Sequence, residues 1–409
     1  PSRERSLLLQ TVQTNRGIGV LNSMSSHIVI RLKALAKDLG FSCVGICPAT
    51  QPPHYEAFLD WLGAGFHGEM NYLAARRETY GNPSLILPNA RSLIMLGFPY
   101  DNVPQSAPLP GFGTISRYAR GRDYHHVIRQ RLKQLEEMLI AECPGKSARG
   151  VVDTAPLLER DFAQLAGLGW IGKNTSLIHP DRGSYMFLAA LLTTAELEPD
   201  PPFMTDLCRT CSACLRSCPT GALVAPRVLD ARRCLSYLTI ELRGFIPQEL
   251  RAFVGNWFFG CDLCQEACPW NQRSPIARIS NTRCEERVIN LIALFGWGDD
   301  EFRKVFRSTA LWRAKRRGLL RNAAIVLGNQ RCQSAWDVLV KGLRDTEPVV
   351  REACAWALVR IDRARAIPFI QSQLSEEADP NVAPFLSAYL QEARSSCDVS
   401  SPQWVDRNR

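Results

Sequence analysis

The pattern of apolar positions predicts alternating helices and strands over the first half of the chain. Apolar residues recur at helical spacing over 28–39, and the run FSCVGIC follows as a short buried strand. Helices over 54–63 and 70–77, a strand at SLIMLGF, an amphipathic helix after Tyr124 and a strand at YMFLAALLTT continue the pattern. These elements predict an α/β domain.

The last third of the chain shows no strand alternation and contains an internal repeat. GLLRNAAIVLGN around Arg321 and VVREACAWALVRI around Arg351 are similar segments 30 residues apart, and each has a second apolar helix beside it. Two helices per repeat of this length predict a short HEAT-like solenoid, an architecture that presents binding surfaces.

Between these regions lie two closely spaced cysteine runs. The first, CRTCSACLRSCPTGAL, has the CxxCxxCxxxCP spacing that holds 4Fe-4S clusters in bacterial two-cluster ferredoxins, and GCDLCQEACPW follows about forty residues later. Two clusters need eight thiolates; the runs supply seven, and Cys234 between them is the eighth. In such ferredoxins the fourth cysteine of a run reaches the other cluster, which assigns Cys208, Cys211, Cys214 and Cys268 to one cluster and Cys218, Cys234, Cys261 and Cys264 to the second.

Zinc and disulfides are the alternatives for these cysteines. Zinc usually takes two CxxC pairs, and a third close cysteine followed by CP has no place in a tetrahedral site. Disulfides are disfavoured because no hydrophobic secretory segment opens the chain, so the pattern indicates metal or redox chemistry in a reducing compartment. Seven further cysteines are expected to be small buried apolar residues: Cys43, Cys47, Cys143, Cys284, Cys332, Cys354 and Cys397.

Composition and charge narrow the function class. The 409 residues suffice for two or three domains, and 46% hydrophobic with 22% charged residues is ordinary for a soluble protein. No apolar run approaches the roughly 20 residues that span a bilayer. The net charge of +9 favours an anionic partner such as nucleic acid.

A basic segment over 302–321 is the predicted place where nucleic acid binds. It contains eight Lys and Arg residues and no acid, interleaved with Phe302, Phe306 and Trp312. Cations with aromatics are expected where a protein contacts phosphates and stacks on bases, although a solvated helix face remains the alternative. The residues taken as nucleic-acid contacts are Arg313, Lys315, Arg316 and Arg317.

A second stretch with candidate catalytic or binding residues surrounds Asp153. Val151 and Val152 end a predicted strand, which puts Asp153 at a strand's carboxyl edge, where ligand sites of α/β sheets collect. If Pro156 opens the next helix, Asp153 or Thr154 is instead a helix N-cap. A glycine-rich turn over 167–176 permits close approach of a large ligand, but it matches no phosphate-binding pattern, so a bulky cofactor other than a nucleotide is predicted.

The motifs SRYARGRDYH, DTAPLLER, GLGWIGKNT and CLSYLTIE, with the paired cysteine runs and the HEAT-like tail, resemble the epoxyqueuosine reductase family over about residues 25–390. The resemblance implies a cobalamin-dependent iron-sulfur oxidoreductase. It would reduce epoxyqueuosine to queuosine at the wobble position of tRNA, the last step of queuosine biosynthesis. The family is related to reductive dehalogenases, which share cobalamin and two clusters.

The resemblance also implies a site. Base-off cobalamin would lie between the α/β domain and the clusters, and an external low-potential donor would feed the clusters, which in turn would reduce it to cob(I)alamin. Asp153 would be the proton donor, with its pKa raised by burial against the corrin. The implied cobalamin contacts are Arg76, Tyr118, Asp153, Lys173, Asn174, Ser176 and Leu177; from spacing alone, Arg76 suits a solvated helix face better.

The expected organisation is an N-terminal extension (1–23), an α/β cobalamin-binding domain (24–200), a ferredoxin-like two-cluster domain (201–284), a HEAT-like domain for tRNA contact (285–395) and a tail (396–409). Met24 is taken as the natural start. The expected partners are tRNAs with a GUN anticodon, those for tyrosine, histidine, asparagine and aspartate. A cytoplasmic monomer without a membrane partner is expected.

Three competing functions fit less of the sequence. Reductive dehalogenases acting on small molecules usually carry an export signal and lack a helical repeat. A two-cluster electron carrier has no need of the roughly 200 residues before the clusters. A HEAT-type scaffold with structural clusters leaves Asp153 and the glycine-rich turn unexplained.

Overall fold

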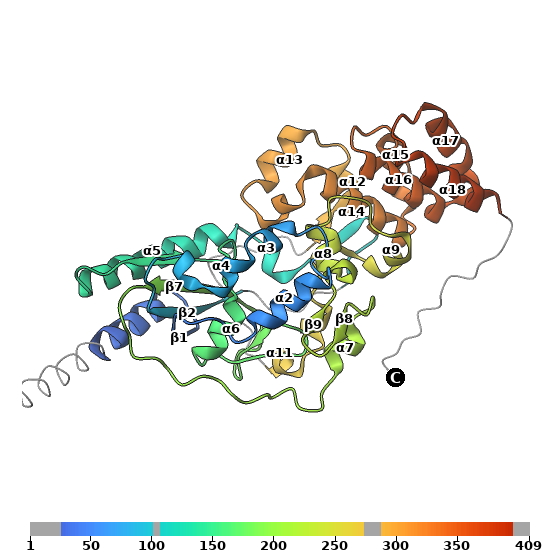
Figure 1. The fold of residues 1–409 in the computed structure, drawn as a ribbon. Coiled ribbons are helices and arrows are strands. Elements are labelled where there is room, and N and C mark those ends of the chain that lie inside the picture. Colours follow the sequence, from blue (N-terminus) through green and yellow to red (C-terminus); the bar gives the residue numbers. More distant parts are fainter. Residues whose placement is uncertain (1–25, 101–106, 274–287, 396–409) are drawn as a thin grey trace, which may run out of the picture.

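The computed structural model describes residues 26–100, 107–273 and 288–395. The sheet built from residues 43–193 lies on the left of Figure 1, and the helices of residues 315–394 lie at its upper right. The predictions for residues 1–23 and 396–409, and those for Cys284 and Cys397, fall outside the described residues.

A four-stranded sheet forms the centre of the first domain. The strand order is β1-β2-β7-β4, and every neighbouring pair is antiparallel. The strands span Cys43–Pro48 (β1), Ser92–Pro99 (β2), Met186–Thr193 (β7) and Ala148–Val151 (β4). The central strands β2 and β7 bury most of their side chains on both faces, which explains why both are continuous apolar runs in the sequence.

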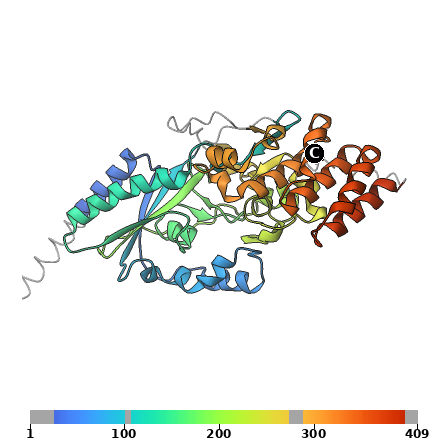
Figure 2. The ribbon, with the colours of Figure 1, turned by 90° about the horizontal axis from the view of Figure 1, so that it is seen from above.

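Helices cover both faces of this sheet. One face packs against the helix of residues 26–38 and against α5 (Tyr124–Glu142), whose buried positions Ile128, Leu132, Leu135 and Leu139 share one helix face. The other face packs against α6 (Glu159–Leu165). Figure 2 shows α5 on one side of the sheet and the blue helices that follow β1 on the other. The predicted mixture of helix and strand is confirmed.

Two details differ from the prediction. The single helix expected over 70–77 is two helices, α3 (Asn71–Ala75) and α4 (Arg77–Gly81), because the backbone leaves the helical region at Arg76. They follow α2 (Tyr55–Gly63) and precede a 3-10 turn, η1 (Pro83–Leu85). The sheet is also antiparallel throughout, whereas the rule that ligands collect at carboxyl edges concerns parallel strands.

A second, three-stranded sheet joins the three predicted domains. β3 (Phe112–Ile115) pairs in parallel with β10 (Trp257–Phe259) and antiparallel with β11 (Val288–Asn290). One hydrophobic cluster extends from Ile115 to Leu390. The cysteine segment and the helical repeats therefore share a core.

The cysteine segment consists of short elements. Each run leads into a short helix, and these two helices, α7 and α10, pack against each other. The hairpin of β5 (Trp170–Ile171) and β6 (Leu177–Ile178) precedes this segment in the chain. The elements of the segment are α7 (Ala213–Ser217), β8 (Leu223–Ala225), β9 (Val228–Leu229), η3 (Ala231–Arg233), α8 (Leu235–Ile240), α9 (Gln248–Val254), α10 (Leu263–Glu266) and α11 (Pro269–Arg273).

The C-terminal part is helical, as the repeat predicts. α12 (Leu291–Leu294), α13 (Asp299–Phe306) and η4 (Ala310–Arg313) lead into α14 (Lys315–Asn329), followed by η5 (Gln333–Ala335), α15 (Trp336–Gly342), α16 (Pro348–Ile361), α17 (Arg363–Glu376) and α18 (Ala383–Arg394). The two similar segments are α14 and α16, which pack directly together. Among the helices in the described parts of the chain, none combines the length and apolar character needed to span a membrane.

A buried ion pair links the cysteine segment to the repeats. The guanidinium of Arg251 on α9 lies 2.8 Å from the carboxylate of Glu352 on α16, and neither side chain is more than 1% exposed. Arg251 also donates to the carbonyl oxygen of Ile246 and the hydroxyl of Tyr389. Its donors are thus satisfied within the protein.

Removing one partner of this pair should be costly. We expect Glu352→Leu to lower the free energy of unfolding by about 3–5 kcal/mol, because it leaves a buried cation without a carboxylate. Urea denaturation followed by tryptophan fluorescence measures this. As a control, Glu376→Ala removes the exposed pair with Arg344 and should cost below about 1 kcal/mol. Equal losses in the two variants would contradict the assignment.

Candidate functional site

Asp153 lies at the edge of a large cavity. It lies just beyond the end of a strand, as predicted, two residues after the last residue of β4, and its φ of 51° is a left-handed conformation that aspartate tolerates better than most residues. The cavity has a volume of about 400 Å³, and its lining residues are Tyr100, Tyr124, Asp153, Glu159, Arg160, Thr175, Ser176, Leu177, Ser184, Met186, Phe187, Leu188 and Gln265. The N-cap alternative is wrong, because α6 begins at Glu159 and its N-cap is Leu158.

Two side chains from the start of α5 bind the Asp153 carboxylate. The Tyr124 hydroxyl donates to Oδ2 at 2.7 Å, and His125 Nε2 lies 3.0 Å from the same oxygen. The other ring nitrogen of His125 lies 2.7 Å from Asp123 Oδ1, so the imidazole bridges two carboxylates. Tyr124 also stacks on Phe187, with ring centroids 4.0 Å apart. These contacts fix the carboxylate toward the cavity.

The protonation states differ from the expectation for Asp153. Burial raises the pKa of Asp153, but hydrogen bonds from His125 and Tyr124 outweigh burial, and the net pKa is lowered. Burial disfavours the charged form of His125, yet its two carboxylate partners raise the pKa of the imidazole to about 9. At neutral pH the proton therefore lies on His125, and Asp153 is ionised.

Glu159 is a further acid that sequence reasoning missed. Burial and the neighbouring negative charge of Asp153 raise the pKa of Glu159 to about 8. Its Oε1 accepts the backbone N–H of Asp153 at 2.8 Å. A protonated carboxyl group thus lines the cavity beside an ionised one. Glu159 stands in the motif DTAPLLER and His125 in SRYARGRDYH, but nothing in the spacing singles them out.

The predicted cofactor contacts fall into three groups. Ser176 and Leu177 line the large cavity with Asp153. Lys173 and Asn174 line a different cavity, among cysteines. The remaining two, Arg76 and Tyr118, line neither cavity.

Arg76 and Tyr118 contact residues near the large cavity without lining it. Arg76 is exposed, and its Nη1 donates to the carbonyl oxygen of Thr154 at 3.4 Å, on the loop that carries Asp153. Tyr118 is packed between Tyr124 and Phe259, and burial raises its pKa. Both therefore support the walls of the site.

Two glycines of the glycine-rich turn have a steric role within the protein. A Cβ at Gly169 would lie 2.1 Å from the carbonyl oxygen of Ile178, and one at Gly172 would lie 2.4 Å from the Ile178 side chain. These glycines are needed so that the β5-β6 hairpin closes on itself. Close approach of a ligand to this turn stays a prediction.

Four of the predicted cluster cysteines surround a small cavity of about 50 Å³. Its lining includes Cys208, Cys211, Cys214 and Cys268, one of the two sets assigned from the sequence. The Trp170 indole N–H points at Cys208 Sγ, 3.3 Å away, and Lys173 Nζ donates to the carbonyl oxygens of Arg209 and Cys211. Among the described residues no three His, Cys, Asp or Glu side chains converge closely enough for a single metal ion. The four cysteines line a space instead.

The other four cysteines are electrostatic neighbours. Burial raises the pKa of the Cys264 thiol, and Cys234 and Cys218 raise it further. Burial likewise raises the pKa of Cys261, with contributions from Cys234 and Cys264. Cys214 of the first group also acts on Cys264, so the two groups are adjacent.

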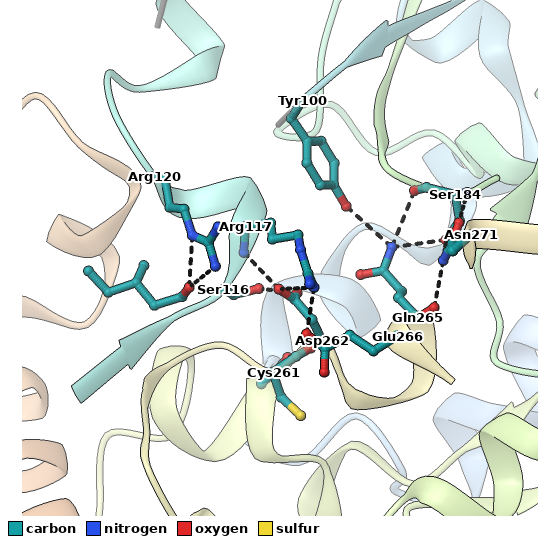
Figure 3. Close-up of polar contacts among 12 residues, drawn as sticks. Tyr100, Ser116, Arg117, Arg120, Ser184, Cys261, Asp262, Gln265, Glu266 and Asn271 are labelled. Atoms are coloured by element: carbon teal, nitrogen blue, oxygen red, sulfur yellow. Dashed lines mark hydrogen bonds and ion pairs between the residues drawn. The ribbon is translucent and has the colours of Figure 1, made fainter. Parts of the chain in front are cut away.

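A polar network connects the second cysteine run to the cavity (Figure 3). Asp262 accepts the backbone N–H of Arg117 at 2.8 Å and the Ser116 hydroxyl. Gln265 donates to the Tyr100 hydroxyl and to Ser184. Because Gln265 also lines the large cavity, α10 of the second cysteine run forms part of its wall.

The basic segment is only partly exposed. Arg316 pairs with Asp345 at 2.6 Å, and Arg321 is buried, 1% exposed, with its donors on backbone carbonyls. Arg321 is therefore not available to a phosphate, contrary to its place in the predicted stretch. Arg313 pairs with Glu241 and lies over the Tyr72 ring.

Lys315 and Arg317 form no ion pair within the described residues. Lys315 is exposed and lies over the Trp312 ring, and Arg317 is half-buried. The positive charge of Arg313 contributes to lowering the pKa of Asp153, so this basic segment approaches the large cavity.

Three family models match the chain. They are described as epoxyqueuosine reductase QueG, DUF1730 (residues 81–154), 4Fe-4S double cluster binding domain (207–271) and HEAT repeats (309–384). The last two confirm the predicted pair of 4Fe-4S clusters and the helical repeat.

Several curated relatives and solved structures share the name epoxyqueuosine reductase. The epoxyqueuosine reductase of Escherichia coli (strain K12) is 37% identical over 364 residues, 86% of this chain and 94% of the relative. That of Pseudomonas aeruginosa is 42% identical over 338 residues, 80% and 93%. A crystal structure of epoxyqueuosine reductase with an epoxyqueuosine-modified tRNA-Tyr stem loop matches with a TM-score of 0.84 and 30% identity, over 91% of this chain and 100% of that one. A Bacillus subtilis epoxyqueuosine reductase, with its catalytic aspartate loop swung out of the active site, matches with 0.82 and 29%, over 90% and 99%.

The bridging imidazole predicts a pH dependence of stability. Its folded-state pKa of about 9 exceeds the ordinary 6.5, so its stabilisation is complete below about pH 6.5 and is lost as pH rises through about 9. The loss should reach about 3 kcal/mol at most. Urea unfolding at the two pH values should show this slope in the wild type and a flatter one in His125→Asn. The variant of exposed His126, His126→Asn, serves as control, and an unchanged slope in His125→Asn would refute the bridge.

Proposed function

This chain belongs to the epoxyqueuosine reductase family, and we propose that it reduces epoxyqueuosine to queuosine at the wobble position of tRNA, the last step of queuosine biosynthesis. The enzyme is an oxidoreductase. The observation that carries the proposal is the acidic site around Asp153, in a cavity whose wall includes Gln265, between two of the predicted cluster cysteines. The matching crystal structure with a tRNA stem loop supports the substrate class.

The residues fit two iron-sulfur clusters. Each cubane needs four thiolates around a space, and Cys208, Cys211, Cys214 and Cys268 enclose one. Cys218, Cys234, Cys261 and Cys264 would hold the second. Clusters of this kind carry one electron at a time, with potentials set by burial and by hydrogen bonds to sulfur. The Trp170 indole supplies such a bond at Cys208.

The larger cavity fits cobalamin in part of its outline. Asp153, Ser176 and Leu177 line it, and both polar and apolar groups are present for a macrocycle with amide-bearing edges. Cobalamin, when bound there, would supply a cobalt centre able to act on a substrate carbon. Arg76 would hold the Asp153 loop, and Lys173 and Asn174 would separate the cofactor from the first cluster.

Protons are the protein's own contribution to the reaction. Removing an epoxide oxygen as water consumes two electrons and two protons. The ionised Asp153 carboxylate would take the proton of His125 Nε2, which lies 3.0 Å away, and pass it to the epoxide oxygen. Glu159, with a pKa of about 8, holds another proton in the same cavity. Such acids are expected to contribute about 100- to 10,000-fold to the rate.

The proposed substrate, electron donor, location and oligomeric state follow from the same family membership. The substrate would be a tRNA with a GUN anticodon, and the electrons would come from an external low-potential donor. We take the enzyme to be a cytoplasmic monomer. A dehalogenase-like activity on a small molecule or a bare electron carrier would leave the basic segment beside the cavity without a use.

Substitution of Asp153 tests the proposed reaction. We expect Asp153→Asn to lower turnover about 100- to 10,000-fold, because the amide can neither take the proton of His125 nor pass it to the epoxide oxygen. Asparagine also tolerates the positive φ, so the loop should keep its shape. Turnover is measured by mass spectrometry of nucleosides released from epoxyqueuosine-containing tRNA, with dithionite as reductant.

Iron, sulfide and cobalamin content should remain at wild-type levels in this variant. Asp181→Asn, on an exposed loop, is the matched control. If Asp153→Asn turned over as fast as Asp181→Asn, Asp153 would not be the acid. Wild-type protein that binds iron but neither cobalamin nor tRNA would refute the reaction itself.

The basic segment allows a second test. We expect Lys315→Glu with Arg317→Glu to raise the KM for tRNA about tenfold or more and to flatten its salt dependence, because phosphate contacts release counterions. The kcat should change little. Steady-state assays at several salt concentrations measure this.

The control for that test has the same charge change elsewhere. Lys37→Glu with Lys133→Glu alters two exposed lysines on helices that pack against the first sheet. An equal effect of the two double variants would mean that net charge, and not this segment, governs tRNA affinity. Arg316 is unsuitable as a probe, because its ion pair with Asp345 also supports the fold.

A further inference from the structure

The first group of cysteines reaches the protein surface at one point. Cys211 is exposed, whereas the other seven predicted cluster ligands are buried or half-buried. The loop around it is held by Lys173, whose ammonium group donates to the carbonyl oxygens of Arg209 and Cys211. Electron transfer slows steeply with distance, so this point is the natural entry for electrons that arrive from outside.

The surface around Cys211 is basic. Residues 201–234 contain five arginines and two acids. Both acids are already paired, Asp206 with Arg227 at 2.7 Å and Asp230 with Arg232 at 2.9 Å.

Three arginines of this stretch remain unneutralised. Within the described residues, Arg209, Arg216 and Arg233 have no carboxylate at ion-pair distance, and all three are exposed. Arg209 is in the Cys208–Cys211 loop, Arg216 is on α7, and Arg233 lies over the turn at Gly221 that follows Cys218. The segment that carries the exposed thiol therefore has an excess of positive charge.

This face is separate from the basic segment next to the large cavity. In Figure 1, α7 and the β8-β9 hairpin lie below α8 and α9, whereas α14 lies above them and α13 near the top. A partner here would not need to compete with a tRNA bound along the repeats. Val224 on β8, 45% exposed, adds an apolar contact of the kind found at the centre of interfaces.

We propose that the face formed by Arg209, Arg216 and Arg233 around Cys211 docks a small acidic electron-transfer protein, which reduces the adjacent cluster. The inference rests on the proposed function, because that reaction needs an external donor. Each encounter moves one electron: the donor's reduced centre is oxidised, the cluster is reduced, and no bond is made or broken. Two encounters supply one turnover. Redox complexes of this kind have small interfaces and depend on charge steering for their association rate.

The test measures cluster reduction directly, without tRNA. Reconstituted protein is mixed with a reduced acidic [2Fe-2S] ferredoxin in a stopped-flow instrument, and bleaching of the cluster absorbance is followed. Arg209→Glu with Arg216→Glu should lower the second-order rate constant about tenfold or more at low salt and flatten its salt dependence. Lys37→Glu with Lys133→Glu is the control of equal charge change and should behave as wild type. Reduction by dithionite should be equal in all three proteins.

Several outcomes would overturn the proposal. One is the same ferredoxin rate in the two double variants. Another is a loss of tRNA affinity in Arg209→Glu with Arg216→Glu while the ferredoxin rate is unchanged, which would make the face an RNA surface. If that variant loses iron, Arg209→Gln with Arg216→Gln replaces it, and an unaltered rate there is equally adverse.

Failure of the proposed function is visible separately. Wild-type protein whose clusters are reduced by ferredoxin in the expected charge-dependent way, but which leaves epoxyqueuosine in tRNA unchanged, would refute the reaction and retain the docking face. Clusters reduced only by dithionite, with normal tRNA turnover, would refute the docking face and retain the reaction.

Discussion

The arrangement of the cysteine segment depends on the buried guanidinium of Arg321. From α14 it donates to the carbonyl oxygens of Leu238, Leu242 and Gly244, at 2.7, 2.9 and 2.6 Å. These carbonyls lie at or beyond the end of α8, where a helix leaves its last acceptors unsatisfied and its dipole is negative. Burial and nearby arginines lower the pKa of Arg321 to about 9, so it remains charged at neutral pH. Since α8 begins directly after Cys234, a residue of the helical repeat fixes a predicted cluster ligand.

The neighbouring residue extends this constraint. Asn322 donates to the carbonyl oxygens of Thr239 on α8 and Phe258 on β10, and β10 ends two residues before Cys261. Two of the four cysteines proposed for the second cluster are thus positioned from α14. This explains why the repeats share one hydrophobic core with the cysteine segment. The repeats are a structural part of the redox protein as well as a candidate surface for tRNA.

The sequence predicted the features that depend on spacing and missed those that depend on neighbours. Cysteine spacing is local, so the grouping of Cys208, Cys211, Cys214 and Cys268 follows from the sequence alone, as does the position of Asp153 after a strand. The proton on His125 does not, because it requires Asp123 and Asp153 on opposite sides of one imidazole. The raised pKa of Glu159 likewise arises from burial, which no local pattern encodes. For the same reason the sequence could not show which arginines of the basic segment are available to a phosphate. Arg321 and Arg316 have internal partners on segments far away in the chain.

The segment 170–177 unites the two cavities. Trp170 and Lys173 face the first cysteine group, through the Cys208 sulfur and the carbonyls of its loop. Asn174 lines the same small cavity, and its amide lies 3.5 Å from the carbonyl oxygen of Cys264, a cysteine of the second group. Ser176 and Leu177, two or three residues later, line the large cavity with Asp153. A single hairpin therefore forms a shared wall, and its thickness is only a few residues. The glycines that sequence reasoning assigned to a ligand make this possible, because a side chain at Gly169 or Gly172 would collide with Ile178 and force the hairpin open. A displaced hairpin would disturb the sulfur contact at Cys208 and the lining near Asp153 together, so the tight turn ties the geometry of electron supply to the geometry of proton supply.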